Sequence, residues 1–148
     1  MFQEEEQLAA ACTAAVPGKE IWQLYHYNAV WFSGQTHGDL GDHAGEAAAA
    51  HRLAGLRPTE GKTHRIAAEL LAHAITLVAG DERLAAADRQ RRQLELEREG
   101  MQRLEAAAEH GYDDFERLRD GARLAPLRAL PGFAEVLARV KANADAGK

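Results

Sequence analysis

The chain has 148 residues, a formal net charge of −5 and an apolar fraction of 46%. This length suits a single domain with its own core, and the acidic balance argues against a nucleic-acid-binding surface, which needs a basic patch. Proline is scarce, alanine dominates the apolar residues, and runs of valine, isoleucine and threonine are missing. The composition therefore predicts an all-α protein.

Two features of the sequence bear on the cellular compartment. The one cysteine, Cys12, excludes an intrachain disulfide and suits a reducing environment. The chain starts with acidic residues, whereas a secretory signal starts basic and continues apolar, and no stretch reaches the ~18 apolar residues of a membrane span. We therefore expect a cytoplasmic protein that does not enter a membrane.

The N-terminal part of the chain predicts two helices, separated by a Val-Pro-Gly break at residues 16–18. The first spans residues 3–15 and has three glutamates near its N-terminus, where negative charge is favourable. The second runs from Glu20 to about Ser33 and holds five of the nine aromatic residues: Trp22, Tyr25, Tyr27, Trp31 and Phe32. Large side chains suit a core helix, but tryptophan and tyrosine are also favoured at surfaces that meet a partner. Both interpretations stay open.

A turn and an alanine-rich helix are expected next. Glycines and aspartates predict a turn from Gln35 to Asp42, and a third helix begins at Asp42 or His43 and ends near Leu56. Most apolar residues of this helix are alanines, and their small side chains allow neighbouring helices to approach closely. Residues 57–61 interrupt the helical pattern again.

The strongest periodicity in the chain predicts a helical hairpin, and its first arm spans residues 62–79. Apolar residues at steps of three and four cover more than half of this helix, which predicts packing on two sides. Thr63 is the expected N-cap, because its hydroxyl can accept a hydrogen bond from a free backbone N–H. Gly80 is expected to end the helix in the left-handed conformation.

The second arm of the hairpin spans about residues 86–110. It carries one apolar stripe, which includes Leu94, and one charged side, so we expect one face to pack and the other to meet solvent. A helix of about 25 residues is ~37 Å long. The pattern therefore predicts that this hairpin is the spine of the domain.

The C-terminal part predicts short closing helices within residues 112–142. Asp113 or Asp114 can cap the first of them, and leucines mark the second. Pro131 suits the first turn of the last helix, where its missing N–H is not needed. The tail from Asn143 has little apolar content and is expected to fray.

Residues 20–58 resemble a tetratricopeptide repeat, a unit of about 34 residues built from two antiparallel helices. Gly34, Gly41 and Pro58 follow one another at the spacings of this family. The stretch from residue 46 to residue 58 resembles the second helix of the repeat.

The stretch from residue 110 to residue 133 resembles the segment that closes arrays of tetratricopeptide repeats in many bacterial proteins. It contains a Gly-Tyr pair, two aspartates, a Leu-Arg pair, a Pro-Leu-Arg run and a final Pro-Gly-Phe in the order of that segment. The two resemblances imply four parts of a single domain: a capping helix at 1–16, a first repeat at 20–58, a lengthened second hairpin at 62–111 and closing helices at 112–142.

The resemblance also implies a fold and a role. Stacked antiparallel hairpins would form a short superhelix, because one hairpin cannot bury its apolar face alone. Its concave face, lined by the first helix of each repeat, would bind a protein or a peptide. We expect a non-catalytic adaptor or scaffold that uses neither cofactor nor metal. The residues carried over as candidates for binding that partner are Asn28, Trp31, Gln35, Arg65, Glu69 and His73.

Two alternatives remain open from the residues themselves. The chain can be a structural module that forms a homo-oligomer through an exposed helix face, or a helical bundle that binds a small ligand or a metal ion. His37 and His43, with Asp39 and Asp42 between them, carry donor groups that suit a divalent transition metal, although their spacing matches no standard ligand motif. Cys12 has no basic neighbour that would activate it, and no glycine-rich phosphate loop occurs.

Overall fold

A computed structural model describes residues 2–16, 18 and 20–147 of the chain. Over these residues the regular structure is helical throughout, with no strand, which confirms the predicted all-α class. The elements in chain order are α1 (Phe2–Ala15), α2 (Glu20–Asp39), α3 (His43–Leu56), α4 (Gly61–Gly80), α5 (Ala86–Glu109), α6 (Phe115–Asp120), the 3₁₀ helix η1 (Ala122–Leu124), α7 (Ala125–Arg128) and α8 (Phe133–Ala146).

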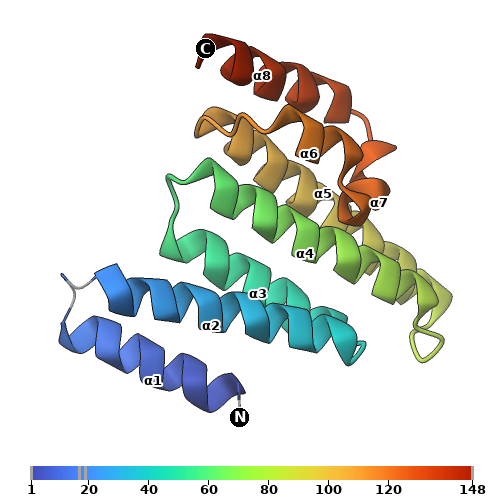
Figure 1. The fold of residues 1–148 in the computed structure, drawn as a ribbon. Helices are drawn as coiled ribbons and strands as arrows, with labels where there is room; N and C mark the ends of the chain where they lie inside the picture. Colours follow the sequence, from blue (N-terminus) through green and yellow to red (C-terminus); the bar gives the residue numbers. More distant parts are fainter. Residues whose placement is uncertain (1, 17, 19, 148) are drawn as a thin grey trace.

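The long helices form a stack of antiparallel hairpins (Figure 1). Each helix from α1 to α5 packs against the next one in the chain, and α2 also contacts α4. In Figure 1, α2 and α4 lie side by side in the front layer, and α3 and α5 lie behind them. The stack begins at α1 and ends at α8, which contacts α5, α6 and α7. The predicted arrangement of stacked helical hairpins is therefore confirmed.

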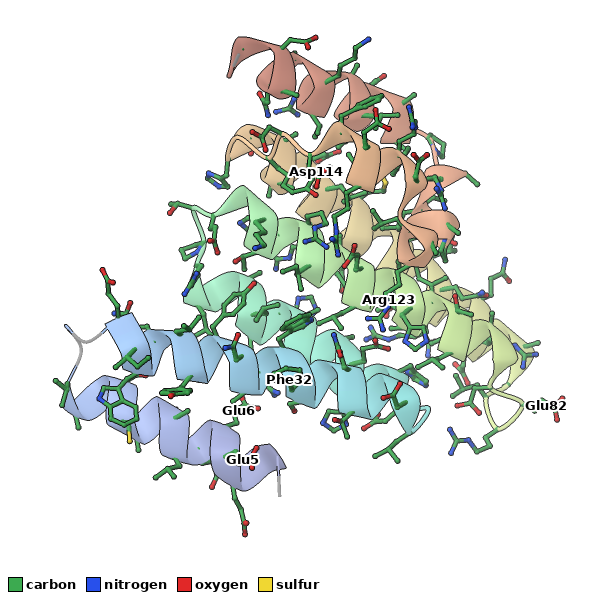
Figure 2. All side chains as sticks on the ribbon, viewed as in Figure 1. Glu5, Glu6, Phe32, Glu82, Asp114 and Arg123 are labelled. Atoms are coloured by element: carbon green, nitrogen blue, oxygen red, sulfur yellow. The ribbon has the colours of Figure 1, made fainter. Side chains whose placement is uncertain are left out.

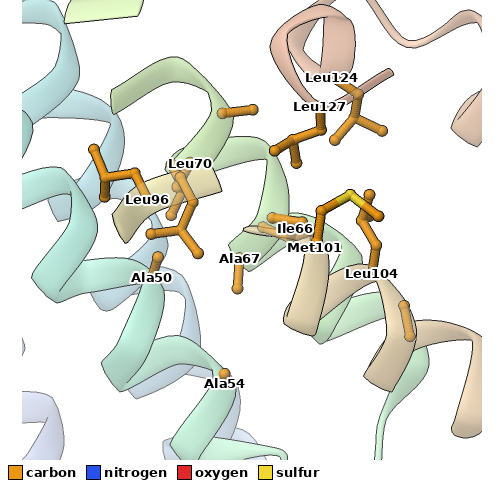
Figure 3. Packing of buried hydrophobic residues seen from close by; sticks show 14 of the residues in the cluster. Ala50, Ala54, Ile66, Ala67, Leu70, Leu96, Met101, Leu104, Leu124 and Leu127 are labelled. Carbon is orange, nitrogen blue, oxygen red and sulfur yellow. The ribbon is translucent and has the colours of Figure 1, made fainter. Parts of the chain in front are cut away.

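Helix α4 is the central element of the core. It contacts α2, α3, α5, α7 and η1, and thirteen of its twenty residues are buried. Figure 3 shows Leu70 of α4 close to Ala50 of α3 and Leu96 of α5, with Leu124 and Leu127 beyond them. The sequence prediction that this helix packs on more than one side is confirmed.

Helix α3 fits between its neighbours because its inward side is built from small residues. Four of its alanines and Leu53 are buried. The approach is closest at Gly34 of α2, where a Cβ atom would lie 3.0 Å from the Cβ of Ala49 and 3.0 Å from a methyl carbon of Leu70. The absence of a side chain at Gly34 therefore lets α2, α3 and α4 meet at one point.

Helix α2 is longer than the sequence predicts. It continues to Asp39, so the expected turn from Gln35 to Asp42 contracts to three residues around Gly41, whose φ of 73° lies in the left-handed region. Gly38 was expected in that turn, but Gly38 and Gly34 both lie inside the helix and face tightly packed neighbours. Asp42 then caps α3, because its side-chain oxygen accepts the N–H of Gly45 at 2.9 Å.

The ends of α4 also differ from the prediction. The helix begins one turn earlier than Thr63, with Glu60 in the N-cap position. The Thr63 hydroxyl contacts the phenol of Tyr27 at 3.2 Å and the Glu60 carboxylate, so it takes part in side-chain contacts instead of capping. Gly80 remains helical and does not adopt a positive φ, and the C-cap is Asp81.

Helix α5 has the predicted buried stripe, with one exception. Its buried residues repeat every three or four positions: Leu96, Gly100, Met101, Leu104, Ala107 and Ala108. Leu94 is 59% exposed, so its placement on the packed face is wrong. The reason is geometric, because Leu94 and Leu96 are two positions apart and point to nearly opposite sides of a helix.

Helices α7 and α8 pack onto α5, and α8 continues to Ala146. Asp114 caps α6 by accepting the N–H of Arg117 at 3.0 Å. The last helix starts after Gly132, in the left-handed region, so Pro131 precedes the helix instead of lying in its first turn. The side-chain amide of Asn143 donates hydrogen bonds to the carbonyl of Ala108 in the last turn of α5, at 2.8 Å, and to the carbonyl of Tyr112 in the α5–α6 connection, at 3.0 Å. These bonds anchor Asn143, the first residue of the segment that was expected to fray.

Candidate functional site

A groove of about 380 Å³ lies between α2 and α4, and we call it the α2–α4 groove. It contains four of the six residues that the sequence predicted for partner binding. Asn28 and Trp31 come from α2, and Arg65 and Glu69 from α4, the neighbour of α2 in the front layer (Figure 1). Its full lining is Leu24, Tyr27, Asn28, Trp31, Arg57, Glu60, Lys62, Arg65, Ile66, Glu69 and Arg117.

The floor of the α2–α4 groove carries a buried ion pair. Arg65 is only 3% exposed, and its Nη1 lies 2.7 Å from a carboxylate oxygen of Glu69, one turn further along α4. Arg117 of α6 approaches the other oxygen of Glu69 at 3.9 Å. The Nε of Arg65 has no hydrogen-bond partner among the described residues. A buried guanidinium with an unused donor is energetically unfavourable, so the pairing with Glu69 is what offsets the burial of this charge.

A second set of polar contacts supports one end of the groove. The guanidinium of Arg57 lies 4.6 Å from the centre of the Tyr27 ring, which is a cation–π contact. The Tyr27 hydroxyl is 3.2 Å from the hydroxyl of Thr63. Burial raises the pKa of Tyr27 above its ordinary value of 10.0, so the phenol keeps its proton and can donate. The contacts tie α2 to the first turn of α4.

Trp31 forms the apolar part of the groove wall. Its ring is partly buried and packs against the core cluster, and it stacks on Phe32 with 5.2 Å between ring centres. Part of the indole therefore supports the fold and part lines the groove. The core interpretation of the aromatic helix is therefore confirmed in part at this residue, and the partner-surface interpretation stays a prediction.

The two remaining predicted residues lie outside the groove lining. Gln35 is half-buried, one turn beyond Trp31 on α2. The Nδ1 of His73 is 3.0 Å from both carboxylate oxygens of Glu46, which is fully buried on α3. Burial raises the pKa of the Glu46 carboxyl above its ordinary value. The His73 side chain is thus engaged with α3.

Three cationic residues of the groove were missed in the sequence. Lys62 lies three positions before Arg65 and seven before Glu69, so extending that helical stripe backwards would have found it. Arg57 precedes α4 in the chain, and Arg117 comes from α6. No sequence signal links these two arginines to α2, because only the tertiary packing brings them together.

The groove continues into an adjoining pocket of about 600 Å³ at the N-terminus of α4. The two share four residues, Glu60, Lys62, Arg65 and Arg117. The pocket is completed by the α5–α6 connection, including the buried Tyr112, whose ring lies 5.7 Å from the guanidinium of Arg65. The combined surface therefore runs from α2 across α4 to α6.

The histidines considered as metal ligands form separate pairs. His37 lies 2.8 Å from Asp42, and His43 lies 3.6 Å from Asp81 at the far end of α4. A hydrogen bond from the Gly45 backbone, with the contact to His37, lowers the pKa of Asp42 below its ordinary value of 3.8. Within the described part of the chain, no group of three or more His, Cys, Asp or Glu side chains is arranged to hold a metal ion.

No protein-family model, curated protein or solved structure matched the chain in the three comparisons. Among the described residues, no helix has the length and apolar character that crossing a membrane requires.

Proposed function

We propose that this protein is a non-catalytic adaptor that binds a segment of another protein in the α2–α4 groove and its adjoining pocket. The observation that carries the proposal is the convergence of Asn28, Trp31, Arg65 and Glu69 on one open surface. The resemblance to tetratricopeptide repeats implies these same residues, which come from two different helices, as candidates for partner binding.

The composition of the groove favours a peptide over a purely apolar or purely charged ligand. Trp31 and Leu24 offer apolar contacts, Asn28 can both donate and accept hydrogen bonds, and the charged side chains have both signs. A peptide offers the same mixture of apolar side chains, amide groups and charges. In the stacked-hairpin arrangement that the tetratricopeptide resemblance implies, this surface would be the concave face.

The chemistry of the buried pair supports binding rather than catalysis. An arginine guanidinium is a poor proton-transfer group. Glu69 lies 2.7 Å from the guanidinium of Arg65, so its carboxylate is engaged in the ion pair. We therefore assign to this pair the recognition of a partner's acceptor groups, with no bond made or broken.

The test is a selection from a random peptide library displayed on phage, with the intact protein as target. We expect selected peptides to bind wild type and to lose about tenfold or more in affinity to the Trp31→Ala variant, a loss equivalent to about 1.4 kcal/mol. Lys62→Glu, at an exposed position of the same lining, should also weaken them. Tyr25→Ala, an exposed aromatic of α2 outside the lining, serves as the matched control.

Two outcomes would contradict the proposal. One is the failure of the library to give any peptide that binds wild type. The other is a set of peptides that bind Trp31→Ala and Lys62→Glu as tightly as wild type. Thermal unfolding of each variant separates lost binding from lost folding, and the proposal requires Trp31→Ala to weaken binding more than it weakens the fold.

A further inference from the structure

A second surface lies on the other side of α2, between α2 and α1, and we call it the α1–α2 hollow. It has a volume of about 690 Å³ and is open to solvent. Asn28 is its one residue in common with the α2–α4 groove. The hollow is lined by Glu5, Leu8, Ala9, Cys12, Trp22, Tyr25, Asn28, Ala29 and Phe32.

Exposed apolar side chains of the described chain are concentrated on α1 and α2, and three of them line this hollow. Nine large apolar residues are exposed, and six of them lie on α1, on α2 or directly after α1: Leu8, Val16, Ile21, Leu24, Tyr25 and Phe32. Leu8, Tyr25 and Phe32 line the hollow and are 67%, 54% and 49% exposed. Trp22 and Tyr25 also contact each other, with 5.9 Å between ring centres. A gathering of this kind marks an interaction site more often than single scattered residues do.

The charge at the edge of the hollow is acidic. Glu5 is the one charged residue in its lining, and both Glu4 and Glu5 are exposed, one turn before Leu8 on α1. Glu6 is already paired, with 2.9 Å between its carboxylate and the Nε of Arg52. Figure 2 shows Glu5 on α1 next to α2, which carries Phe32. Among the described residues, the lining contains no lysine or arginine beside these two exposed glutamates.

We propose that the α1–α2 hollow docks one amphipathic helix of a partner protein, with lysine or arginine flanking its apolar stripe. Two packed helices leave a groove in which a third helix fits with apolar residues at i, i+3 or i+4, and i+7. The basic flanks complement Glu4 and Glu5. The surface is separate from the α2–α4 groove, so the inference does not depend on the function proposed for that groove.

A second copy of the chain fits the hollow less well. A two-fold contact through the hollow would bring the acidic edges of both copies into one interface. The exposed face of α5, which carries charges of both signs, offers one large apolar residue among the described residues, Leu94, between Arg91 and Arg98. One leucine does not fill a hollow lined by three aromatic residues and a leucine. A partner helix with several apolar residues satisfies both the shape and the charge.

The test uses two synthetic 18-residue helices that share a leucine stripe at i, i+3 or i+4 and i+7. One has lysines at the flanking positions and the other has glutamates. Isothermal titration calorimetry with the full chain should show the lysine peptide binding at least about tenfold more tightly than the glutamate peptide, with the preference falling as salt screens the charges. Light scattering of the protein alone gives its oligomeric state.

Pairs of matched variants test whether the lysine peptide binds in the α1–α2 hollow. Phe32→Ala should weaken the lysine peptide by about tenfold, whereas Leu94→Ala, which removes an exposed leucine from α5, should leave the affinity unchanged. Glu5→Lys should weaken it by about threefold at low salt. Glu82→Lys makes the same change in net charge in the α4–α5 connection, remote from α1 (Figure 2), and should have little effect.

Four results would overturn the inference. The first is no binding of the lysine peptide, and the second is equal binding of both peptides. The third is a loss of binding in Trp31→Ala and Lys62→Ala without a loss in Phe32→Ala, which would place the peptide in the α2–α4 groove. The fourth is a dimer by light scattering that Phe32→Ala converts to a monomer, which would assign the hollow to a second copy. Circular dichroism of Phe32→Ala confirms that the variant is folded.

Discussion

Helices α2 and α4 have the same length and lie side by side, yet they differ sharply in how much of each helix is buried. Each has twenty residues, and thirteen are buried in α4 against five in α2. Helix α4 carries mainly aliphatic residues into the core, whereas α2 keeps Tyr25 and Phe32 in solvent while Tyr27 and Val30 face inward. The comparison shows that the helix with more aromatic residues is the less buried of the two. The stability of the fold depends on α4, and the candidate binding surfaces lie on both sides of α2.

The largest effect is expected from Leu70→Ala in α4. Leu70 is almost completely buried between α3, α5 and Gly34 of α2. Removing it should lower the free energy of unfolding by about 2–5 kcal/mol, because the transfer energy is lost and a cavity remains. Urea denaturation followed by circular dichroism measures the change. A loss under about 0.5 kcal/mol would mean that α4 is not the centre of the core.

The second largest effect is expected from Gly34→Val, at the close contact between α2 and α4. Gly34→Val places methyl groups where a Cβ atom alone would already lie 3.0 Å from Ala49 and from Leu70. The overpacked contact should cost about 1–3 kcal/mol of unfolding free energy. Gly55→Val is the control, because a Cβ at Gly55 of α3 meets nothing within 4 Å. Equal losses in both variants would show that only helix propensity is affected.

A smaller effect is expected at the turn after α2. Asp42→Ala removes the cap of α3 and should cost about 1 kcal/mol near neutral pH. The pKa of Asp42 is lowered from 3.8 in the folded state, so its contribution is present above that value and is lost as the pH falls through the lower folded pKa. Urea unfolding at pH about 6 and about 2.5 measures this. The difference between wild type and variant should shrink at the lower pH, whereas a difference that stays constant would contradict an ionised cap.

The smallest effect is expected from Phe32→Ala. Half of its surface is in solvent, so the fold should lose less than about 1 kcal/mol, mainly through the stacking on Trp31. Thermal unfolding beside Leu70→Ala gives the comparison directly. If Phe32→Ala destabilised the protein as strongly as Leu70→Ala, α2 would be a core helix and the contrast between the two helices would disappear.

The sequence predicted the helices whose burial follows from periodicity alone. Helix α4 and the stripe of α5 repeat every three to four residues, and both are found where expected. The predicted end of α2 was wrong because glycine occurs both in turns and at close contacts inside helices. A single sequence does not distinguish these two roles. Gly38 was interpreted as part of a turn, but a Cβ there would lie 2.8 Å from a carboxylate oxygen of Glu46, so it serves close packing inside the helix.

The candidate site was predictable only as far as the tetratricopeptide resemblance reached. The resemblance pointed to Asn28 and Trp31 on α2 and to Arg65 and Glu69 on α4, and all four line the groove. It also pointed to Gln35 and His73, which do not line the groove. His73 is turned to α3 by Glu46, and Arg117 reaches the groove from α6. These placements depend on contacts between segments far apart in the chain.

The hydrogen bonds of Asn143 attach the C-terminal helix α8 to the last turn of α5 and to the α5–α6 connection. The amide joins α8 to carbonyl groups that are 31 and 35 positions away in the sequence, at Tyr112 and Ala108. Tyr112 is also a wall of the pocket beside Arg65. Trimming the chain before Asn143 would therefore loosen the pocket beside Arg65, although none of the removed residues that the structure describes lines it.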